Sequence, residues 1–87
     1  MASPTDRGYA VISHNDDGTV DVDICTAIEN GRPVGIYARH VRAPRLNVDP
    51  GVRMIRTGSV RYTTSVVEVS KGGGGVLVRA RARSLPA

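Results

Sequence analysis

Apolar and polar side chains alternate between residues 19 and 28, with Val20, Val22 and Ile24 on one parity and Asp21 and Asp23 on the other. A period of two is typical of a strand with one buried face. The preceding residues predict a shorter strand over 9–13 and a turn over 14–18, which contains Asn, Asp and Gly. The chain is therefore expected to begin its fold with two strands joined by a turn.

A third strand is predicted over 34–42, after a turn that contains an Asn-Gly pair. A two-residue turn at 30–31 would place Ile24 opposite Tyr37 and would turn Ile36 to the other face of the sheet. A three-residue loop with the glycine in the left-handed conformation would instead place Ile24 opposite Ile36. We favour the three-residue loop because it gathers the apolar side chains on one face.

The segment 43–51 contains two prolines and an Asp-Pro-Gly turn, which argue against a central strand. It is predicted to be an arm or an excursion from the sheet. After it, the pattern predicts a short strand over 52–56 and a final hairpin made of strands over 59–70 and 76–83.

Four consecutive glycines separate the two strands of the final hairpin. If Lys71 pairs with Val76, the valines at 67 and 69 meet apolar partners and Glu68 meets Arg79 on the opposite face. The run does not match a phosphate-binding loop, because the lysine precedes the glycines and a strand follows them. The glycines are therefore interpreted as the tip of a hairpin.

The whole pattern predicts an all-β fold, in which the single domain 1–87 has a short tail over 1–8. Val, Ile and Thr are about three times as frequent as Leu, Glu, Met and Lys, and no stretch shows a helical apolar stripe. We expect a five- to six-stranded antiparallel barrel or sandwich, SH3-like or OB-like, with hairpins at 19–42 and 59–83. The side chains expected in its core are Val20, Val22, Ile24, Ile36, Val67, Val69 and Val78.

A chain of 87 residues with three Tyr and no Phe or Trp can build only a small core. Cys25 is the only cysteine, so a disulfide within the chain is excluded and oligomerisation is the remaining common means of stabilisation. No stretch resembles an export signal or a membrane span, so the protein is expected to be soluble and not exported.

Charge is divided unevenly along the chain. Residues 1–31 hold six acidic side chains and one arginine, a net charge of −5, whereas residues 32–87 hold eleven bases and two acids, a net charge of +9. This asymmetry favours either head-to-tail contact between identical subunits or binding of nucleic acid. The residues predicted for a subunit interface are Asp21, Asp23, Arg79, Arg81, Pro44, Leu46 and Val48. The residues predicted for the nucleic-acid alternative are Arg39, Arg42, Arg53, Arg56, Arg61, Arg79, Arg81 and Arg83.

Catalytic and metal-binding patterns are weak. The segment 17–28 begins like a calcium loop but has Val22 where that loop needs glycine and Ile28 where it needs glutamate. His14, Cys25 and His40 lack the spacing of a metal site, and no nucleophile has an identifiable base. The sequence therefore predicts a protein that is not an enzyme and that uses no cofactor.

The stretch HNDDGTVDVDICTAIENGRPVGI, followed by a proline-rich segment and a glycine-tipped hairpin, resembles the small β-barrel virion proteins of tailed bacteriophages. That family includes head-decoration and head-tail joining proteins. The resemblance implies a structural subunit of a virion, whose partners are copies of itself and a larger scaffold such as a capsid or tail. The alternative is a small nucleic-acid-binding barrel in the cytoplasm, and no membrane partner is expected.

Overall fold

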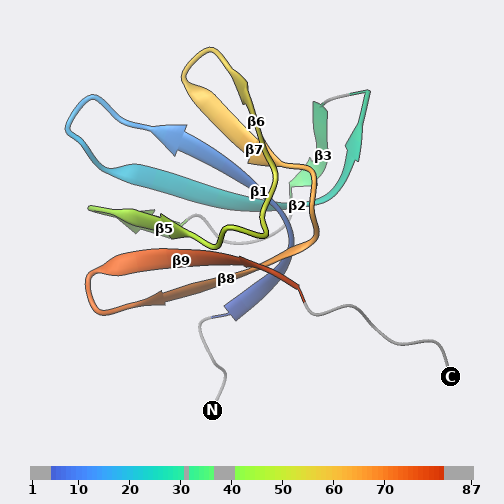
Figure 1. Cartoon of the computed structure of the whole chain (residues 1–87). Coiled ribbons are helices and arrows are strands. Elements are labelled where there is room, and N and C mark those ends of the chain that lie inside the picture. The colour runs from blue at the N-terminus through green and yellow to red at the C-terminus, as the bar shows by residue number, and fades with distance from the viewer. Residues whose placement is uncertain (1–4, 31, 37–40, 82–87) are drawn as a thin grey trace, which may run out of the picture.

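The computed structural model of the protein describes residues 5–30, 32–36 and 41–81. These residues form nine strands and no helix, so none of them belongs to a helix that could span a membrane. The strands make a curled mixed sheet in the shape of a half-barrel (Figure 1). The predicted all-β class is confirmed. The strands are β1 (Thr5–His14), β2 (Val20–Glu29), β3 (Arg32–Ile36), β4 (Val41–Ala43), β5 (Leu46–Val48), β6 (Met54–Thr57), β7 (Val60–Thr63), β8 (Val67–Gly72) and β9 (Gly75–Ala80).

Strand β1 belongs to both halves of the curled sheet. Its first half, up to Gly8, pairs with β8. Its second half, from Tyr9 onward, pairs with β2 on one side, and Val11 and its neighbours pair with β7 on the other. The change of partner occurs at Gly8, whose φ of 149° is a conformation that side-chain-bearing residues rarely adopt. Glycine at this position therefore allows one strand to turn the sheet.

The final hairpin has the predicted register. Lys71 pairs with Val76 and Glu68 with Arg79, and the valines at 67 and 69 lie opposite Ala80 and Val78. The tip is a two-residue turn in which Gly73 and Gly74 have φ angles of 58° and 79°. Two successive positive φ angles require glycine or asparagine in such a turn, which explains the centre of the glycine run.

The favoured register of the β2–β3 hairpin is wrong. Glu29 pairs with Arg32 and Cys25 pairs with Ile36, which corresponds to a two-residue turn at 30–31. Asn30 has a φ of 51°, so asparagine itself supplies the left-handed conformation that we had assigned to Gly31, a residue outside the described part. The twist of such a turn matches the twist of the strands, and this outweighs the gathering of apolar residues.

The strand predicted over 34–42 is divided. Strand β3 pairs with the end of β2, and β4 pairs with its start, with Val22 opposite Val41. From the pair Cys25–Ile36 to the pair Val22–Val41, the residue number changes by three on β2 and by five from β3 to β4. The register of pairing with β2 therefore shifts by two residues. Tyr37 lies in the segment 37–40, outside the described residues.

The proline-rich segment lies at the edge of the sheet, which corrects the prediction of an arm or excursion from it. Strand β5 pairs in parallel with β9, with Leu46 opposite Val76 and Val48 opposite Val78. Asp49 N then donates to the Val78 carbonyl at 2.8 Å. An edge position is compatible with flanking prolines because only one side of the strand needs hydrogen-bond donors.

The predicted strand 59–70 is also divided, into β7 and β8, because the chain passes from one half of the sheet to the other. The corner is held by Thr63, whose side chain is fully buried. Its Oγ1 accepts a hydrogen bond from Ala10 N at 3.3 Å and donates one to the Ser65 carbonyl at 2.9 Å. One hydroxyl thus joins the corner to β1.

The main core fills the concave side of the half-barrel. Six of the seven predicted core residues are buried there, and Ile36, which is 57% exposed, is the exception. Ile36 lies on the opposite face because of the two-residue turn. The buried members of this core are Ala10, Ile12, Val20, Val22, Ile24, Val41, Ala43, Val52, Val67, Val69, Val76 and Val78.

Candidate interaction surface

The convex side of β1, β2, β3, β6 and β7, opposite the main core, also carries apolar side chains; we call it the outer face. Residues paired across neighbouring strands share a face of the sheet. The pairs 55–62, 62–11, 9–25 and 25–36 therefore place their side chains on this one side. The apolar residues gathered on the outer face by these pairs and by the pair 13–60 are Tyr9, Val11, Cys25, Ile36, Ile55, Val60 and Tyr62.

The centre of the outer face is buried and its margins are exposed. Val11, Cys25 and Tyr62 form a second apolar cluster, separate from the main core; we call it the outer-face cluster. At the margins, Ile36 is 57% exposed on β3 and Ile55 is 39% exposed on β6. The outer face thus leaves two large aliphatic side chains in contact with solvent at opposite edges of one apolar surface.

A groove of about 430 Å³ lies at this surface, between the tips of the β2–β3 and β6–β7 hairpins; we call it the hairpin groove. Pro33, Val60 and Tyr62 supply its apolar lining. Asn30, Arg32 and Thr57 supply its polar lining. An apolar groove with a few polar groups is the usual form of a surface that takes a side chain or short segment from another molecule.

Cys25 lies inside the outer-face cluster as a free, buried thiol. Its Sγ donates a hydrogen bond to the Tyr9 carbonyl at 3.4 Å. Burial raises the pKa of the Cys25 thiol, because the thiolate would lose its hydration. A buried thiol with a raised pKa is a poor nucleophile and packs as a small apolar side chain.

The thiol makes stability depend on alkaline pH. Above about pH 8.5 the unfolded thiol ionises while the folded thiol keeps its proton, so the free energy of unfolding falls until the pH passes the raised pKa of Cys25. We expect Cys25→Ala to lose this part of the alkaline decline, as measured by urea midpoints at increasing pH. Identical pH dependence in the two proteins would show that the thiol ionises equally well in the folded state.

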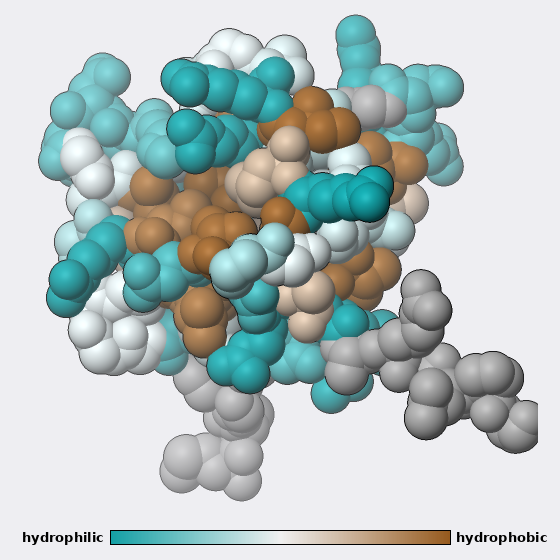
Figure 2. Space-filling model, viewed as in Figure 1, coloured by the Kyte–Doolittle hydropathy of each residue, from teal (hydrophilic) through white to brown (hydrophobic). Residues whose placement is uncertain are grey.

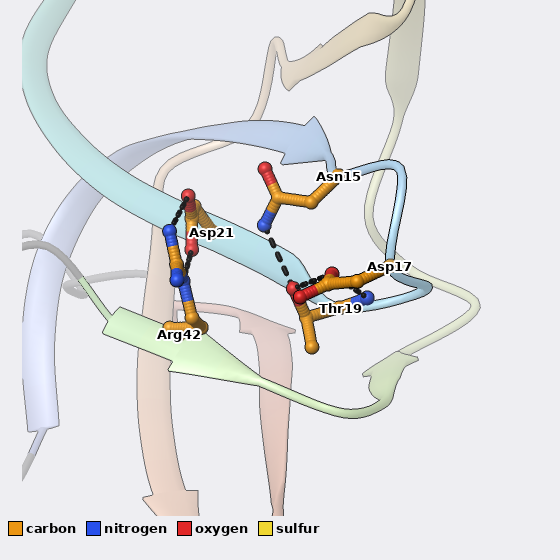
Figure 3. A network of polar contacts seen from close by, with 5 residues as sticks. All are labelled: Asn15, Asp17, Thr19, Asp21 and Arg42. Atoms are coloured by element: carbon orange, nitrogen blue, oxygen red, sulfur yellow. Dashed lines mark hydrogen bonds and ion pairs between the residues drawn. The ribbon is translucent and has the colours of Figure 1, made fainter.

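Asp21 and Arg42, predicted for different functions, form an ion pair with each other (Figure 3). They are directly opposite on β2 and β4, and Arg42 Nε donates to Asp21 Oδ1 at 2.9 Å while its Nη2 donates to Oδ2 at 3.4 Å. The hydrogen bond and charge of Asp21 raise the pKa of Arg42. The carboxylate of Asp21 is buried, so its charge is already compensated within the subunit.

The acidic turn before β2 is also organised internally (Figure 3). Thr19 donates to Asp17 Oδ1 from its hydroxyl at 2.6 Å and from its backbone N at 3.0 Å, and Asn15 Nδ2 donates to the Thr19 hydroxyl at 2.9 Å. The two hydrogen bonds that Thr19 donates lower the pKa of Asp17. Within the described ranges, no group of three or more His, Cys, Asp or Glu side chains is placed to hold a metal ion.

The other predicted interface residues lie in three places. Asp23 is half-buried on β2, opposite Val11. Arg79 is exposed on β9 and faces Glu68 across the hairpin, and Arg81 follows that strand. On β5, Leu46 packs on the main core whereas Val48 is 37% exposed, and Pro44 precedes the strand and is exposed. Figure 2 shows apolar side chains gathered around β5 on the face in view.

The arginines predicted for nucleic acid are not brought together into one stripe. Arg42 is paired with Asp21, and Arg79 and Arg81 lie on the other half of the sheet. Arg56 and Arg61 are directly opposite each other on β6 and β7, and Arg53 precedes β6. The remaining two predicted residues, at 39 and 83, lie outside the described part of the chain.

The outer-face cluster was missed by sequence reasoning, although residues 9–12 contain a signal for it. The run YAVI is apolar at both parities, and an apolar run without alternation is typical of a strand covered on both faces. Ala10 and Ile12 indeed enter the main core, while Tyr9 and Val11 belong to the second cluster.

Comparison with known proteins gives no family for the chain: it matches none of the protein-family models, none of the curated proteins and none of the solved structures with which it was compared.

Proposed function

We propose that the protein is a non-enzymatic assembly subunit, which binds a second copy of itself through the outer face and so takes part in a larger particle. The observation that carries this proposal is the apolar outer face, with its hairpin groove and with Ile36 and Ile55 exposed at its margins. The proposal of a virion as the particle depends on the resemblance of residues 14–36 to phage virion proteins.

The physical argument begins with the two sides of the sheet. An antiparallel sheet in a small monomer usually packs one side on the core and presents polar side chains on the other. Here both sides carry a buried apolar cluster, with Asp21 and Asp23 of β2 also on the second side. The second side has no further layer of strands over its exposed margins among the described residues. Covering this side with another subunit would remove Ile36 and Ile55 from water, a gain of about 25 cal/mol for each Å² of apolar surface.

Charge would orient this contact more than strengthen it. The acidic turn at 15–18 and Arg32, which lines the hairpin groove, belong to the same subunit, so two copies can present opposite charges to each other. Asp21 is less suited to this role because it is paired with Arg42. Exposed ion pairs contribute roughly 0–1 kcal/mol each, so the apolar contact would supply most of the affinity.

We also propose a finer description of the fold, in which β4 and β5 act as one interrupted strand that closes the half-barrel. The support is that β4 pairs with β2 while β5, two residues later, pairs with β9. Together with β1 and β8, such a strand would make a five-stranded barrel, the small barrel that the sequence led us to expect.

The assembly proposal predicts that charges on the outer face separate the subunits. We expect Ile36→Asp combined with Ile55→Asp to convert an oligomer into a monomer, because each change places a carboxylate in the contact. Light scattering coupled to size-exclusion chromatography measures the mass, and circular dichroism checks that the strands remain. The control is Asn47→Asp, at an exposed position on β5 that belongs neither to the outer face nor to the hairpin groove, which should leave the mass unchanged. A parent protein that is monomeric at low and high salt would contradict the proposal.

Nucleic-acid binding is the second candidate, favoured by the pair Arg56 and Arg61. Like charges directly opposite each other destabilise a hairpin, and no carboxylate of the described residues forms an ion pair with either. Such a pair is suited to phosphate contacts. Adding a DNA oligonucleotide to the chromatography experiment separates the two functions, since a monomer that shifts the DNA supports this candidate.

A further inference from the structure

We propose that the protein has a binding site for a phosphate group beside the glycine turn of the β8–β9 hairpin. A second groove, of about 420 Å³, lies there; we call it the glycine-turn groove. Figure 1 shows that the start of β5 lies next to this turn, in agreement with the pairing of Leu46 and Val76. The groove is lined by side chains and backbone of both segments, among them Arg45, Asn47, Ser70, Lys71 and Gly72.

The charges of the lining favour an anion. Arg45 lines the groove from the segment before β5 and Lys71 lines it from the end of β8, and the lining contains no carboxylate. The Arg45 backbone is fixed at the turn, since its carbonyl accepts a hydrogen bond from Val76 N at 3.1 Å. A guanidinium offers a planar pair of donors that matches phosphate oxygens, and an ammonium adds a compact charge. Asn47 adds a neutral amide to the lining.

The four glycines of the turn provide a second, independent argument. Gly73 and Gly74 are required by their positive φ angles. A Cβ at Gly75 would lie 3.4 Å from the Arg45 carbonyl oxygen, which is van der Waals contact with the segment before β5. Gly72 has no positive φ, and a Cβ there would meet no atom within 4 Å.

Glycine at 72 is therefore not explained by the fold. It is the last residue of a strand, where glycine costs conformational entropy and has no side chain to pack. Because Gly72 lines the groove, any side chain there would project from its wall. Glycine keeps the groove open and lets a ligand come close to the backbone of the turn, as at other sites where backbone approaches phosphate.

This site is independent of the proposed assembly surface. None of the residues lining the glycine-turn groove belongs to the outer face or to the hairpin groove. The phosphate group could be that of a small phosphate compound or that of a nucleic-acid backbone, and the two sources present the same oxygens to Arg45 and Lys71.

The test is a titration of the isotope-labelled full chain with inorganic diphosphate, followed by amide chemical shifts in nuclear magnetic resonance. We expect saturable shifts at Gly72, Gly75 and Arg45. Lys71→Gln should raise the dissociation constant by about tenfold, the lower end of the value of a charge-assisted hydrogen bond. Lys71→Arg should restore most of the affinity. Arg53→Gln removes an exposed arginine outside the groove and should change the affinity by less than about twofold.

Gly72→Val is the sharpest variant, because a branched side chain suits a strand but would occupy the groove. It should abolish diphosphate binding while the other amide shifts remain those of the folded parent. The proposal is overturned if sodium chloride at equal ionic strength produces the same shifts, or if Lys71→Gln binds as tightly as the parent. A parallel titration with a short oligothymidylate identifies the source: binding weakened by the same variants indicates a phosphodiester, and binding of diphosphate alone indicates a small phosphate compound.

Discussion

Replacing Ile24 by alanine is expected to lower the free energy of unfolding by about 2–5 kcal/mol. Ile24 is fully buried in the main core and belongs to β2, which pairs with three other strands. Truncation removes the transfer free energy of the lost methyl and methylene groups and leaves a cavity that a closely packed small core cannot fully close. The change is measured from the urea midpoint, with an unchanged slope as the sign that the unfolding remains two-state.

The matched control is the same substitution at Ile36, which is 57% exposed. An exposed isoleucine should cost the isolated subunit about 0.5 kcal/mol or less when it is truncated. The two variants therefore distinguish the two registers of the β2–β3 hairpin. Comparable losses at both positions, in a protein shown to be monomeric, would mean that Ile36 faces the core and that the three-residue loop is correct.

Replacing Thr63 by valine is expected to cost about 1–3 kcal/mol, although the two side chains have nearly the same shape. The change deletes the hydroxyl that accepts from Ala10 N and donates to the Ser65 carbonyl. Both the side chain of Thr63 and Ala10 are fully buried, so the freed amide would have no access to water. Thermal or urea unfolding measures the loss.

Serine at the same position is the control, because Thr63→Ser keeps the hydroxyl and removes only a methyl group. It should cost about 1 kcal/mol. A valine variant as stable as the parent, or more stable than the serine variant, would show that the corner between β7 and β8 does not depend on this hydroxyl.

Local pairing could be predicted from the sequence where two alternating strands flank a turn. The β8–β9 register follows from the valines at 67, 69, 76 and 78, because a slip by one residue would turn the valines of one strand to the opposite face. The β2–β3 hairpin could not be resolved in this way. Apolar patterning favoured the register of a three-residue loop. The structure has the register of a two-residue turn, because Asn30 readily adopts the left-handed conformation that this turn needs.

Long-range pairing could not be predicted. The passage of β1 from β8 to β2 and the division of 59–70 into β7 and β8 depend on contacts between residues 47 to 65 positions apart. A strand that changes partners carries no distinctive local pattern apart from a glycine such as Gly8. The parallel pairing of β5 was hidden for a related reason, since prolines argue against a central strand but allow an edge strand.

The sequence shows which charged residues are available to the candidate surfaces, but it does not show how the fold arranges them. The arginines and aspartates were visible in the sequence, but the pairing of Asp21 with Arg42 depends on the register of β4. The outer face likewise needs the order of five strands before its side chains can be assembled. For the glycine run, the turn could be predicted, whereas the approach of Arg45 follows from the parallel strand β5.

The double membership of β1 has a consequence for the order of folding. Its pairing with β2 is local and can form as soon as both strands exist, because only five residues separate them. Its pairings with β7 and β8 must wait for residues near 60 and 70, and loops of that length close slowly. During synthesis on the ribosome, the β1–β2 hairpin would therefore emerge with both apolar faces uncovered. Until β8 leaves the exit tunnel, this nascent chain would be a substrate for chaperones and prone to premature pairing with its neighbours.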